Sequence, residues 1–323
     1  MKTDPEILKH LLSKGSLLPQ EEMLEIAPKK GQLFIGIPKE TFFQERRVAL
    51  VPEAVSILVL HGHRVKIESK SGEMANFSDR DYSEAGAEIC YDPKEVFECD
   101  MIFKVGPPSE EEIDMMKGNQ TLVSALQITI SAKAILQKLM QKKITAIAWD
   151  YIRDDKGVFP IVRAMSEIAG TTSILIAGEL LSCYSRGKGI MLGGITGFRP
   201  AEVVVIGAGT VGEFAIKGAL GLGASVKVFD SSMSRLRRVQ DNSSTRLFTY
   251  VIQPKNLAKA IANADVVIGA LRAPLGRTPC VVTEEMVESM SPGSVLIDVS
   301  IDQGGCFETS RVTNHKTPTF VKH

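Results

Sequence analysis

A glycine-rich turn is the strongest chemical signal in the sequence. Gly207, Gly209 and Gly212 have the G-x-G-x-x-G spacing, directly after the apolar run 201–206 and directly before the helical pattern 213–223. The first glycine permits a tight turn, the second lets backbone N–H groups approach a pyrophosphate, and the third lets the helix pack closely on the strand. The pattern predicts a dinucleotide site, with a glycine turn that binds no ligand as the alternative.

An acid stands where this site needs one. Asp230 ends the next apolar run, 225–230, at the roughly 20-residue separation of the dinucleotide fingerprint. Its carboxylate would accept hydrogen bonds from the adenine ribose and repel a 2′-phosphate, which predicts NAD and not NADP as the cofactor. Arg235, a little further along the chain, would weaken that preference.

A second acid follows the last apolar run of the same half. Asp302 lies in IDVSIDQGGCFE (297–308) and is followed by Gly304 and Gly305. Ligands of open α/β sheets bind beyond the carboxyl ends of the strands, so this position predicts an acid near a nicotinamide ring. The alternative is an aspartate that caps the backbone amides of its own turn.

Two arginines follow the first apolar run of the other half. Arg46 and Arg47 come shortly after residues 33–37. A guanidinium at the carboxyl end of a strand can hold a substrate carboxylate through two parallel hydrogen bonds. A solvated surface pair is the alternative.

Two successive series of strand and helix patterns must position these groups, and they meet near residue 160. Continuous apolar strands separated by helices predict parallel sheets covered on both faces. We therefore expect two doubly wound α/β domains of Rossmann type with a cleft between them: a substrate domain over 1–160, with a short helical extension at 1–30, and a nucleotide domain over 161–323. A long apolar helix is expected over 166–184. The expected strands are 33–37, 64–69, 100–106, 121–126 and 144–149 in the first domain, and 201–206, 225–230, 265–271 and 293–301 in the second.

Composition excludes several classes of protein. The 323 residues are 44% hydrophobic and 24% charged, which is typical of a globular chain and excludes disorder and coiled coil. Because 38 basic residues balance 38 acidic ones, the chain has no net field to hold nucleic acid or an anionic membrane. No apolar run reaches the about 18 residues of a membrane helix. The cysteines are odd in number and widely spaced, which predicts reduced thiols in a cytoplasm and no metal site: Cys90, Cys99, Cys183, Cys280 and Cys306.

The chain resembles the family of alanine dehydrogenases and pyridine-nucleotide transhydrogenase alpha subunits. The resemblance covers nearly everything from Gly31 to His323 and is nearest to the alanine dehydrogenase branch. The matching segments are GIPKE with ERRVALVP, GHRV, DMIFKV, MSEIAG, VVVIGAGTVG and IDVSIDQGGCFE.

The resemblance implies a set of site residues. It places the substrate carboxylate on Arg47 and a catalytic acid at Asp302. It also places nucleotide contacts on four further positions: Ser166, Asp230, Arg235 and Val299.

Two family positions are changed. Family members have a Lys-Val-Lys run whose second lysine contacts substrate, whereas this chain has Lys104, Val105 and Gly106, so only Lys104 remains as a candidate. The family's catalytic histidine is matched by Gln127, which can hydrogen-bond substrate but cannot titrate. One positioned acid–base group contributes about 10² to 10⁴ to a rate, so these changes bear on activity.

The resulting expectation is an NAD-dependent amino-acid dehydrogenase that converts L-alanine to pyruvate and ammonia. It would be a cytoplasmic homo-oligomer whose partner is a small amino or oxo acid. The alternative is a nucleotide-binding module without turnover, or a transhydrogenase-like subunit. Family members continue past PTF (318–320) with helices that return to the first domain, and we expect this chain to be a fragment that lacks them.

Overall fold

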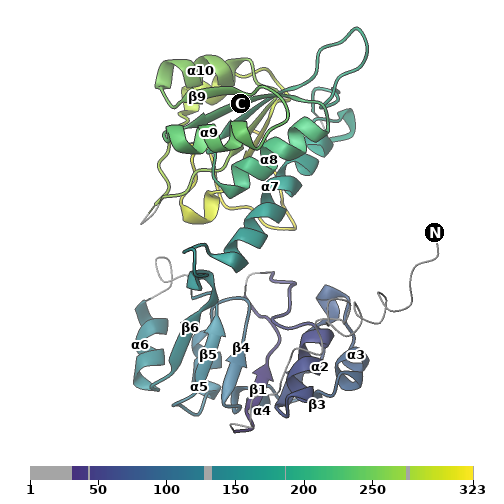
Figure 1. The fold of residues 1–323 in the computed structure, drawn as a ribbon, viewed down its shortest axis with the longest axis vertical. Coiled ribbons are helices and arrows are strands. Elements are labelled where there is room, and N and C mark those ends of the chain that lie inside the picture. The colour runs from purple at the N-terminus through teal and green to yellow at the C-terminus, as the bar shows by residue number, and fades with distance from the viewer. Residues whose placement is uncertain (1–30, 43, 127–132, 186, 274–276, 323) are drawn as a thin grey trace, which may run out of the picture. The chain divides into compact units, whose positions relative to one another are not determined.

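The computed structural model describes residues 31–42, 44–126, 133–185, 187–273 and 277–322. Two compact units divide the chain between Trp149 and Asp150 (Figure 1). We describe each unit by itself, as the N-terminal unit and the C-terminal unit. The expected helical extension at 1–30 and the candidate residue Gln127 lie outside the described residues.

The N-terminal unit contains a six-stranded sheet in the order β3-β2-β1-β4-β5-β6, and every neighbouring pair is parallel. All five strands expected here are present. The additional strand, β3, is a short edge strand of mixed polarity. The strands are β1 (Phe34–Ile37), β2 (Arg64–Glu68), β3 (Glu88–Cys90), β4 (Met101–Phe103), β5 (Thr121–Ser124) and β6 (Thr145–Ala148).

Helices cover both faces of this sheet. Ile35 and Ile37 pack with residues of α2 and α3 on one face, and Ile102 and Leu122 pack with residues of α4, α5 and α6 on the other. Gly36 allows α4 to come close, because a Cβ there would collide with the backbone of Val96. The helices are α2 (Pro52–Leu60), α3 (Asp79–Glu84), α4 (Pro93–Phe97), α5 (Glu110–Met115) and α6 (Lys133–Gln141), with short 3₁₀ turns at η2 (Glu73–Ala75) and η3 (Trp149–Tyr151).

The C-terminal unit contains a five-stranded parallel sheet in the order β11-β10-β7-β8-β9. All four strands expected here are present, and β9 is an additional, largely exposed edge strand. The two parallel sheets confirm the predicted fold class. The strands are β7 (Glu202–Ile206), β8 (Ser225–Asp230), β9 (Phe248–Val251), β10 (Val266–Gly269) and β11 (Val295–Asp298).

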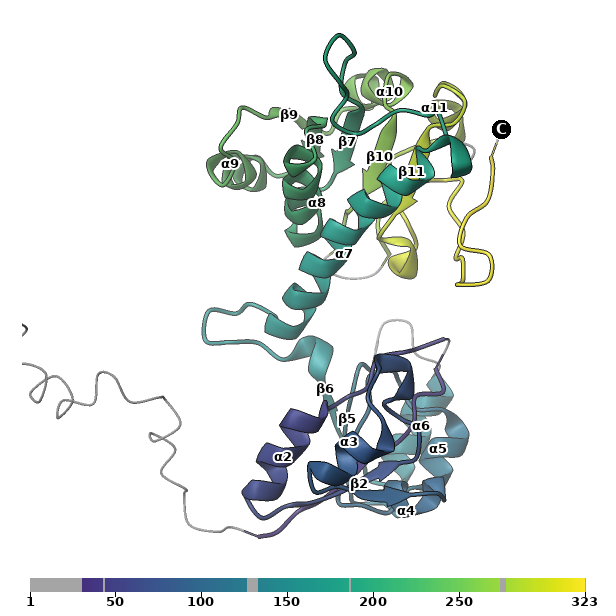
Figure 2. The same cartoon turned by 90° about the vertical axis from the view of Figure 1, so that its right-hand side faces the viewer.

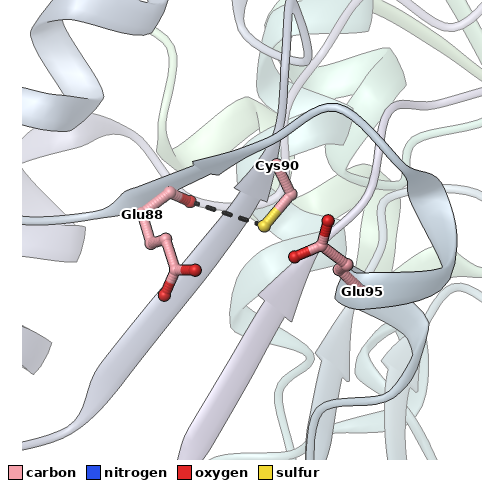
Figure 3. Close-up of side chains that lie close together, drawn as sticks. All are labelled: Glu88, Cys90 and Glu95. Carbon is pink, nitrogen blue, oxygen red and sulfur yellow. Dashed lines mark hydrogen bonds between the residues drawn. The ribbon is translucent and has the colours of Figure 1, made fainter.

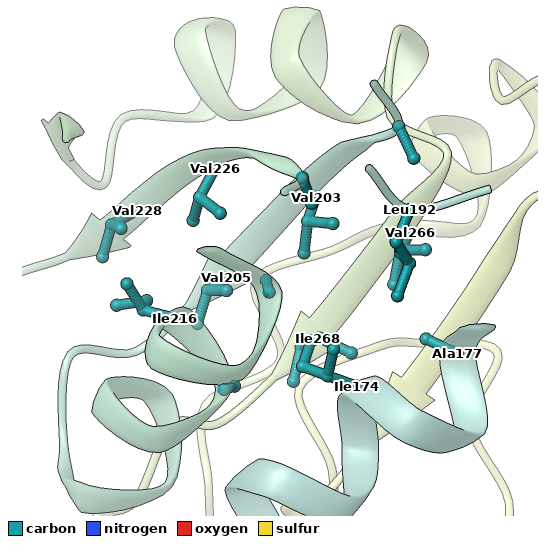
Figure 4. Packing of buried hydrophobic residues seen from close by; sticks show 14 of the residues in the cluster. Ile174, Ala177, Leu192, Val203, Val205, Ile216, Val226, Val228, Val266 and Ile268 are labelled. Carbon is teal, nitrogen blue, oxygen red and sulfur yellow. The ribbon is translucent and has the colours of Figure 1, made fainter. Parts of the chain in front are cut away.

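Side chains of β7 alternate between two cores, one on each face of this sheet. Val203 and Val205 pack with α7, α8 and α9, as Figure 4 shows for the first two helices, while Val204 and Ile206 pack with α10 and α11. This alternation is the period-2 pattern of a strand buried on both sides. The helices are α7 (Pro160–Leu180), α8 (Thr210–Gly221), α9 (Met233–Asp241), α10 (Pro254–Ala262) and α11 (Glu284–Glu288), with 3₁₀ turns at η4 (Cys183–Ser185) and η5 (Ile301–Gln303).

The long helix α7 begins earlier than expected. Its first residue is Pro160, whose fixed φ and missing N–H suit the first helical position. Figure 2 shows α7 running along α8, where Gly170 leaves room for the backbone of Val211. No helix within the described ranges is long and apolar enough to cross a bilayer.

Candidate functional site

The predicted glycine turn joins β7 to α8. Gly207 has a φ of 112°, and a Cβ there would collide with the backbone of Ala270 on the neighbouring segment. Gly212 lies so close to Gly207 that a Cβ would overlap the carbonyl oxygen of Gly207. Gly209 differs from both, because a Cβ there would meet nothing within 4 Å. The turn is therefore tight beneath the helix and open at its N-terminus, where the first N–H groups of a helix attract anions.

Asp230 braces this turn from the end of β8. Its side chain is completely buried, and its carboxylate accepts hydrogen bonds from the backbone N–H of Ala208 and of Ser232, both at 2.7 Å. Each oxygen uses one lone pair in this way and retains another. Arg235 places a guanidinium nitrogen 3.9 Å from the same carboxylate. Arg238 donates to the carbonyl oxygen of Ala208 at 2.7 Å.

The loop after β11 is held by a second carboxylate, that of Asp298. It accepts from the backbone N–H of Ser300 and of Cys306, both at 3.0 Å, so the loop folds back over the strand end. The turn depends on two glycines in succession, because Gly304 and Gly305 have φ values of 104° and 73°. These are left-handed conformations that strain other residues.

Asp302 lies on the short turn η5 within this loop. Its side chain reaches solvent, yet the surrounding protein removes enough water to raise its pKa above the ordinary value, more than backbone hydrogen bonds and Arg272 lower it. A raised pKa suits a carboxylate that exchanges protons during a reaction.

Two further candidate nucleotide contacts lie in the same unit. Val299 is partly buried against the core, and its N–H donates to the carbonyl oxygen of Gly269 at 2.9 Å. Ser166 is half-buried on α7, and its hydroxyl donates to Val162 in the preceding turn at 2.8 Å. Three candidate residues lie at the carboxyl ends of parallel strands and therefore at the same edge of the sheet. Gly207 follows β7, Asp230 ends β8 and Val299 follows β11.

In the N-terminal unit, Arg47 forms a two-pronged ion pair with Glu45. Its Nε and one terminal nitrogen donate to the two carboxylate oxygens at 2.8 and 2.7 Å. Glu45 also accepts from the backbone N–H of Arg46 and Arg47. The side-chain hydrogen bonds to Glu45 raise the pKa of Arg47. Burial alone would raise the pKa of Glu45, but its hydrogen bonds with Arg47 lower it below the ordinary value. The Arg47 side chain remains 53% exposed.

Lys104 has a different environment from Arg47. Its side chain is fully buried, and its ammonium lies 2.8 Å from Glu112 and 3.5 Å from Glu40. Beside it, Gly106 is covered by Phe42, whose Cβ would be 2.9 Å from a Cβ at Gly106. The two candidate substrate-binding cations of this unit thus differ, since Arg47 is exposed and Lys104 is enclosed between carboxylates.

Comparison with known proteins covers both units. The models of the N-terminal and C-terminal domains of alanine dehydrogenase/PNT match residues 36–169 and 173–323. The chain belongs to the alanine dehydrogenase/PNT family.

Relatives from two organisms support this family membership. The chain is 41% identical to alanine dehydrogenase of Methanococcus maripaludis over 292 residues, which cover 90% of this chain and 78% of the relative. Its identity to alanine dehydrogenase of Bacillus subtilis is 40%, over 90% of this chain and 77% of the relative.

Solved structures of the alanine dehydrogenase/PNT family have the same fold. An L-alanine dehydrogenase superposes with a TM-score of 0.84 at 38% identity and covers 90% of this chain and 80% of its own. A transhydrogenase from Sinorhizobium meliloti superposes with a TM-score of 0.73 at 26% identity, over 86% of this chain and 81% of its own. The predicted family is confirmed, and these relatives support an oxidoreductase role.

A cluster of possible metal ligands lies on the edge strand β3 of the N-terminal sheet and on the neighbouring helix α4. Figure 3 shows Glu88 and Cys90 of β3 beside Glu95 of α4, with ligand atoms within 4.8 Å of one another. Lys66 lies 3.4 Å from both carboxylates and Arg64 3.3 Å from Glu88. These cations already neutralise the carboxylates, and burial raises the pKa of the Cys90 thiol. We assign no metal to this cluster.

Several residues of the candidate site were not predicted from the sequence. Asp298 lies inside the predicted strand 293–301, Glu40 and Glu45 belong to the quoted segments, and Glu112 lies in α5. The GIPKE and ERRVALVP segments contain two of them, but nothing in their spacing indicates which lysine or arginine each would meet. The missed residues are Glu40, Glu45, Glu112 and Asp298.

Proposed function

We propose that this chain is an NAD-dependent dehydrogenase that oxidatively deaminates a small L-amino acid, with L-alanine as the leading substrate. L-alanine, NAD⁺ and water would give pyruvate, ammonium, NADH and a proton. The observation that carries the proposal is the open glycine turn with Asp230 beneath it, in a chain about 40% identical to alanine dehydrogenases.

The residues present fit the cofactor. The space beside Gly209 leaves a cradle at the N-terminus of α8 for a pyrophosphate. Asp230, buried at the end of β8, would accept from a ribose hydroxyl after a local rearrangement that uncovers its carboxylate. When bound, the nicotinamide would supply the acceptor for the substrate hydride. Ser166, Val299 and Arg235 complete the proposed nucleotide contacts.

The chain's own residues would then divide the remaining work. Arg47 would hold the substrate carboxylate through two parallel hydrogen bonds, in exchange for its present ion pair with Glu45. Asp302 would accept a proton as water adds to the substrate, since its raised pKa brings it closer to the operating pH than an ordinary aspartate. Gln127 would orient the substrate without exchanging protons. In this scheme residues 1–160 present the substrate and residues 161–323 bind the nucleotide.

The proposal extends to a cytoplasmic homo-oligomer. Large apolar side chains on α7 support self-association, because Ile161, Ile168 and Leu175 are 40%, 59% and 59% exposed and recur along one side of the helix. Ile168→Glu is expected to lower the oligomer number in sedimentation analysis. An unchanged oligomer would remove α7 from the proposed interface.

Steady-state assays with a panel of amino and oxo acids test the function. Turnover with L-alanine above other amino acids supports it. Gln127→His is expected to raise turnover, because histidine has an ordinary pKa of about 6.5 and can act as a general base near neutrality. A protein that binds NAD but stays inert with every substrate, both unmodified and as Gln127→His, would instead be a non-catalytic or transhydrogenase-like module.

A further inference from the structure

Three ionisable side chains are buried together in the N-terminal unit. We call them the Glu40 cluster: Glu40 after β1, Lys104 after β4 and Glu112 in α5, whose side chains are 4%, 0% and 6% exposed. Two carboxylates share one ammonium, so the cluster has an excess of negative charge in a site with little water. Such an arrangement is costly unless hydrogen bonds compensate for the lost hydration.

Backbone N–H groups provide that compensation for Glu40. One carboxylate oxygen accepts from the N–H of Val105 at 2.5 Å, and the other accepts from the N–H of Gly106 at 3.2 Å. Burial still raises the pKa of Glu40, against the lowering effect of Lys104 and these two hydrogen bonds. A single side chain thus fixes the backbone that follows β4 to the loop that follows β1.

Glu112 fastens the other side of the cluster. One of its oxygens accepts from Lys104 at 2.8 Å and from the hydroxyl of Thr41 at 2.9 Å. Its other oxygen accepts from the N–H of Ser109, as part of a capping box at the start of α5. The cluster therefore joins two strand-end loops to the N-terminus of a helix.

The candidate substrate arginine lies on one of these loops. Arg47 follows Glu40 on the segment between β1 and α2. Its pKa is raised first by the hydrogen bond to Glu45, and the negative charge of Glu40 adds to that effect. Glu40 is therefore close enough to influence Arg47 electrostatically as well as through the loop.

We propose that Glu40 is a positioning residue that holds the Arg47 loop in place, with Lys104 as its buried counter-ion and not as a substrate ligand. The proposal follows from the full burial of Lys104 between two carboxylates and from the paired backbone contacts of Glu40. The expected change in KM rests on the proposed function, whereas the expected change in amide exchange does not.

Amide hydrogen exchange tests the structural consequence. Glu40→Gln replaces one acceptor oxygen by an NH₂ group, so the side chain can accept from Val105 or from Gly106 but no longer from both. We expect amide exchange to become at least about tenfold faster at one or both of these residues, as for loss of a hydrogen bond to a charged group. The matched control is Glu111→Gln, an exposed glutamate beside Glu112 in α5. Unchanged exchange at both amides in Glu40→Gln would overturn the proposal.

Kinetics test the consequence for the substrate. Glu40→Gln is expected to raise KM for the amino acid by about tenfold, to change kcat by less than about threefold, and to leave the Kd of NAD unchanged. Faster amide exchange with an unchanged KM would overturn the positioning role. Absence of turnover in the unmodified protein would instead contradict the proposed function, and the exchange experiment would still decide whether Glu40 holds the loop.

A double-mutant cycle separates a counter-ion from a ligand. If Lys104 affects substrate binding only through Glu40, Lys104→Met should raise KM in the unmodified protein but add little in the Glu40→Gln background. If Lys104 binds substrate directly, the two effects on KM should multiply, and that result would overturn its assignment as counter-ion. Should Lys104→Met fail to fold, Lys104→Arg provides a second test, because it keeps the charge and changes the donor geometry. A counter-ion role then predicts a nearly unchanged KM, and a KM raised by about tenfold or more would overturn the assignment.

Discussion

The two sheets carry their polar groups at the strand ends in different ways. In the C-terminal unit, Asp230 and Asp298 accept from backbone N–H groups, including those of Ser232 and Ser300 two residues further on. In the N-terminal unit, the ammonium of Lys104 is held by carboxylates from two other segments. Backbone donors hold the carboxylates of the C-terminal edge, whereas the N-terminal edge adds close side-chain ion pairs to its backbone donors.

This difference determines which substitutions should matter. A backbone N–H is present in every residue but proline, so the C-terminal edge depends on backbone shape and hence on its glycines. A side-chain ion pair can be removed from either end, and removal of one partner leaves a buried charge uncompensated. We therefore expect the C-terminal edge to be sensitive to substitution of its glycines and the N-terminal edge to be sensitive to substitution of its charged residues.

The largest expected effect tests whether Asp302, at the C-terminal edge, accepts a proton during the reaction. Asp302→Asn keeps the shape of the side chain but cannot accept a proton, so kcat should fall by about 10² to 10⁴. The Kd of NAD should stay within about tenfold, because Asp302 is outside the glycine turn. Asp241→Asn, at an exposed site at the end of α9, is the control in the same assay. Full activity in Asp302→Asn would show that the proton acceptor lies elsewhere.

The next effect compares two glycines of one turn. Gly209→Ala adds a methyl group to open space and should leave the melting temperature nearly unchanged while it weakens NAD binding by about tenfold or more. Gly212→Ala forces a methyl group into the carbonyl of Gly207 and should destabilise the unit itself. Calorimetric titration and thermal unfolding of both variants measure the contrast. Equal NAD affinity in Gly209→Ala and the unmodified protein would mean that no phosphate occupies this space.

The C-terminal edge was largely predictable from the sequence because its contacts are local or belong to a motif of fixed spacing. The glycine turn, the strand before it and the acid after the next strand all occupy their expected positions. Both sheets were also expected, since their central strands are continuous apolar runs. The edge strands β3 and β9 were missed because they have only three and four residues, of mixed polarity or largely exposed.

The N-terminal edge was predictable only in part. Arg47 could be proposed as a carboxylate clamp, but its pairing with Glu45 could not be read from a charged segment with several possible partners. Glu40 contacts a backbone N–H 65 residues away, and Thr41 contacts Glu112 71 residues away. Such pairings are fixed by strand order and loop path, which no local pattern specifies.

A smaller effect concerns cofactor choice. Asp230→Ala should narrow the preference for NAD over NADP by about tenfold, since the carboxylate that would repel a 2′-phosphate is lost while Arg235 remains. Because Ala208 and Ser232 each lose an acceptor, the variant should also be less stable by about 1 to 3 kcal/mol. Titrations with both nucleotides measure the first effect and denaturant unfolding the second. Tighter binding of NADP than of NAD by the unmodified protein would contradict the assignment.

The smallest expected effect is a difference in how two aspartates, one from each unit, change the stability of the protein with pH. Asp81 completes a capping box at the start of α3 in the N-terminal unit, and hydrogen bonds from Ser78 lower its pKa. Burial raises the pKa of Asp302 in the C-terminal unit. A carboxyl whose pKa is lowered by folding stabilises the folded state above its unfolded pKa, whereas one whose pKa is raised destabilises it there.

Asp81→Asn should therefore lower the melting temperature at pH 7, and Asp302→Asn should raise it slightly. Both differences should shrink as the pH falls. For Asp302→Asn, the difference in melting temperature from the unmodified protein should vanish as the pH falls from the raised folded pKa to the unfolded pKa of about 3.9. For Asp81→Asn, the difference should vanish only below that unfolded pKa. Thermal unfolding of the three proteins between pH 7 and the acid limit of folding measures this. A lower melting temperature for Asp302→Asn at pH 7 would mean that this carboxylate stabilises the fold by holding backbone amides, as those of Asp230 and Asp298 do.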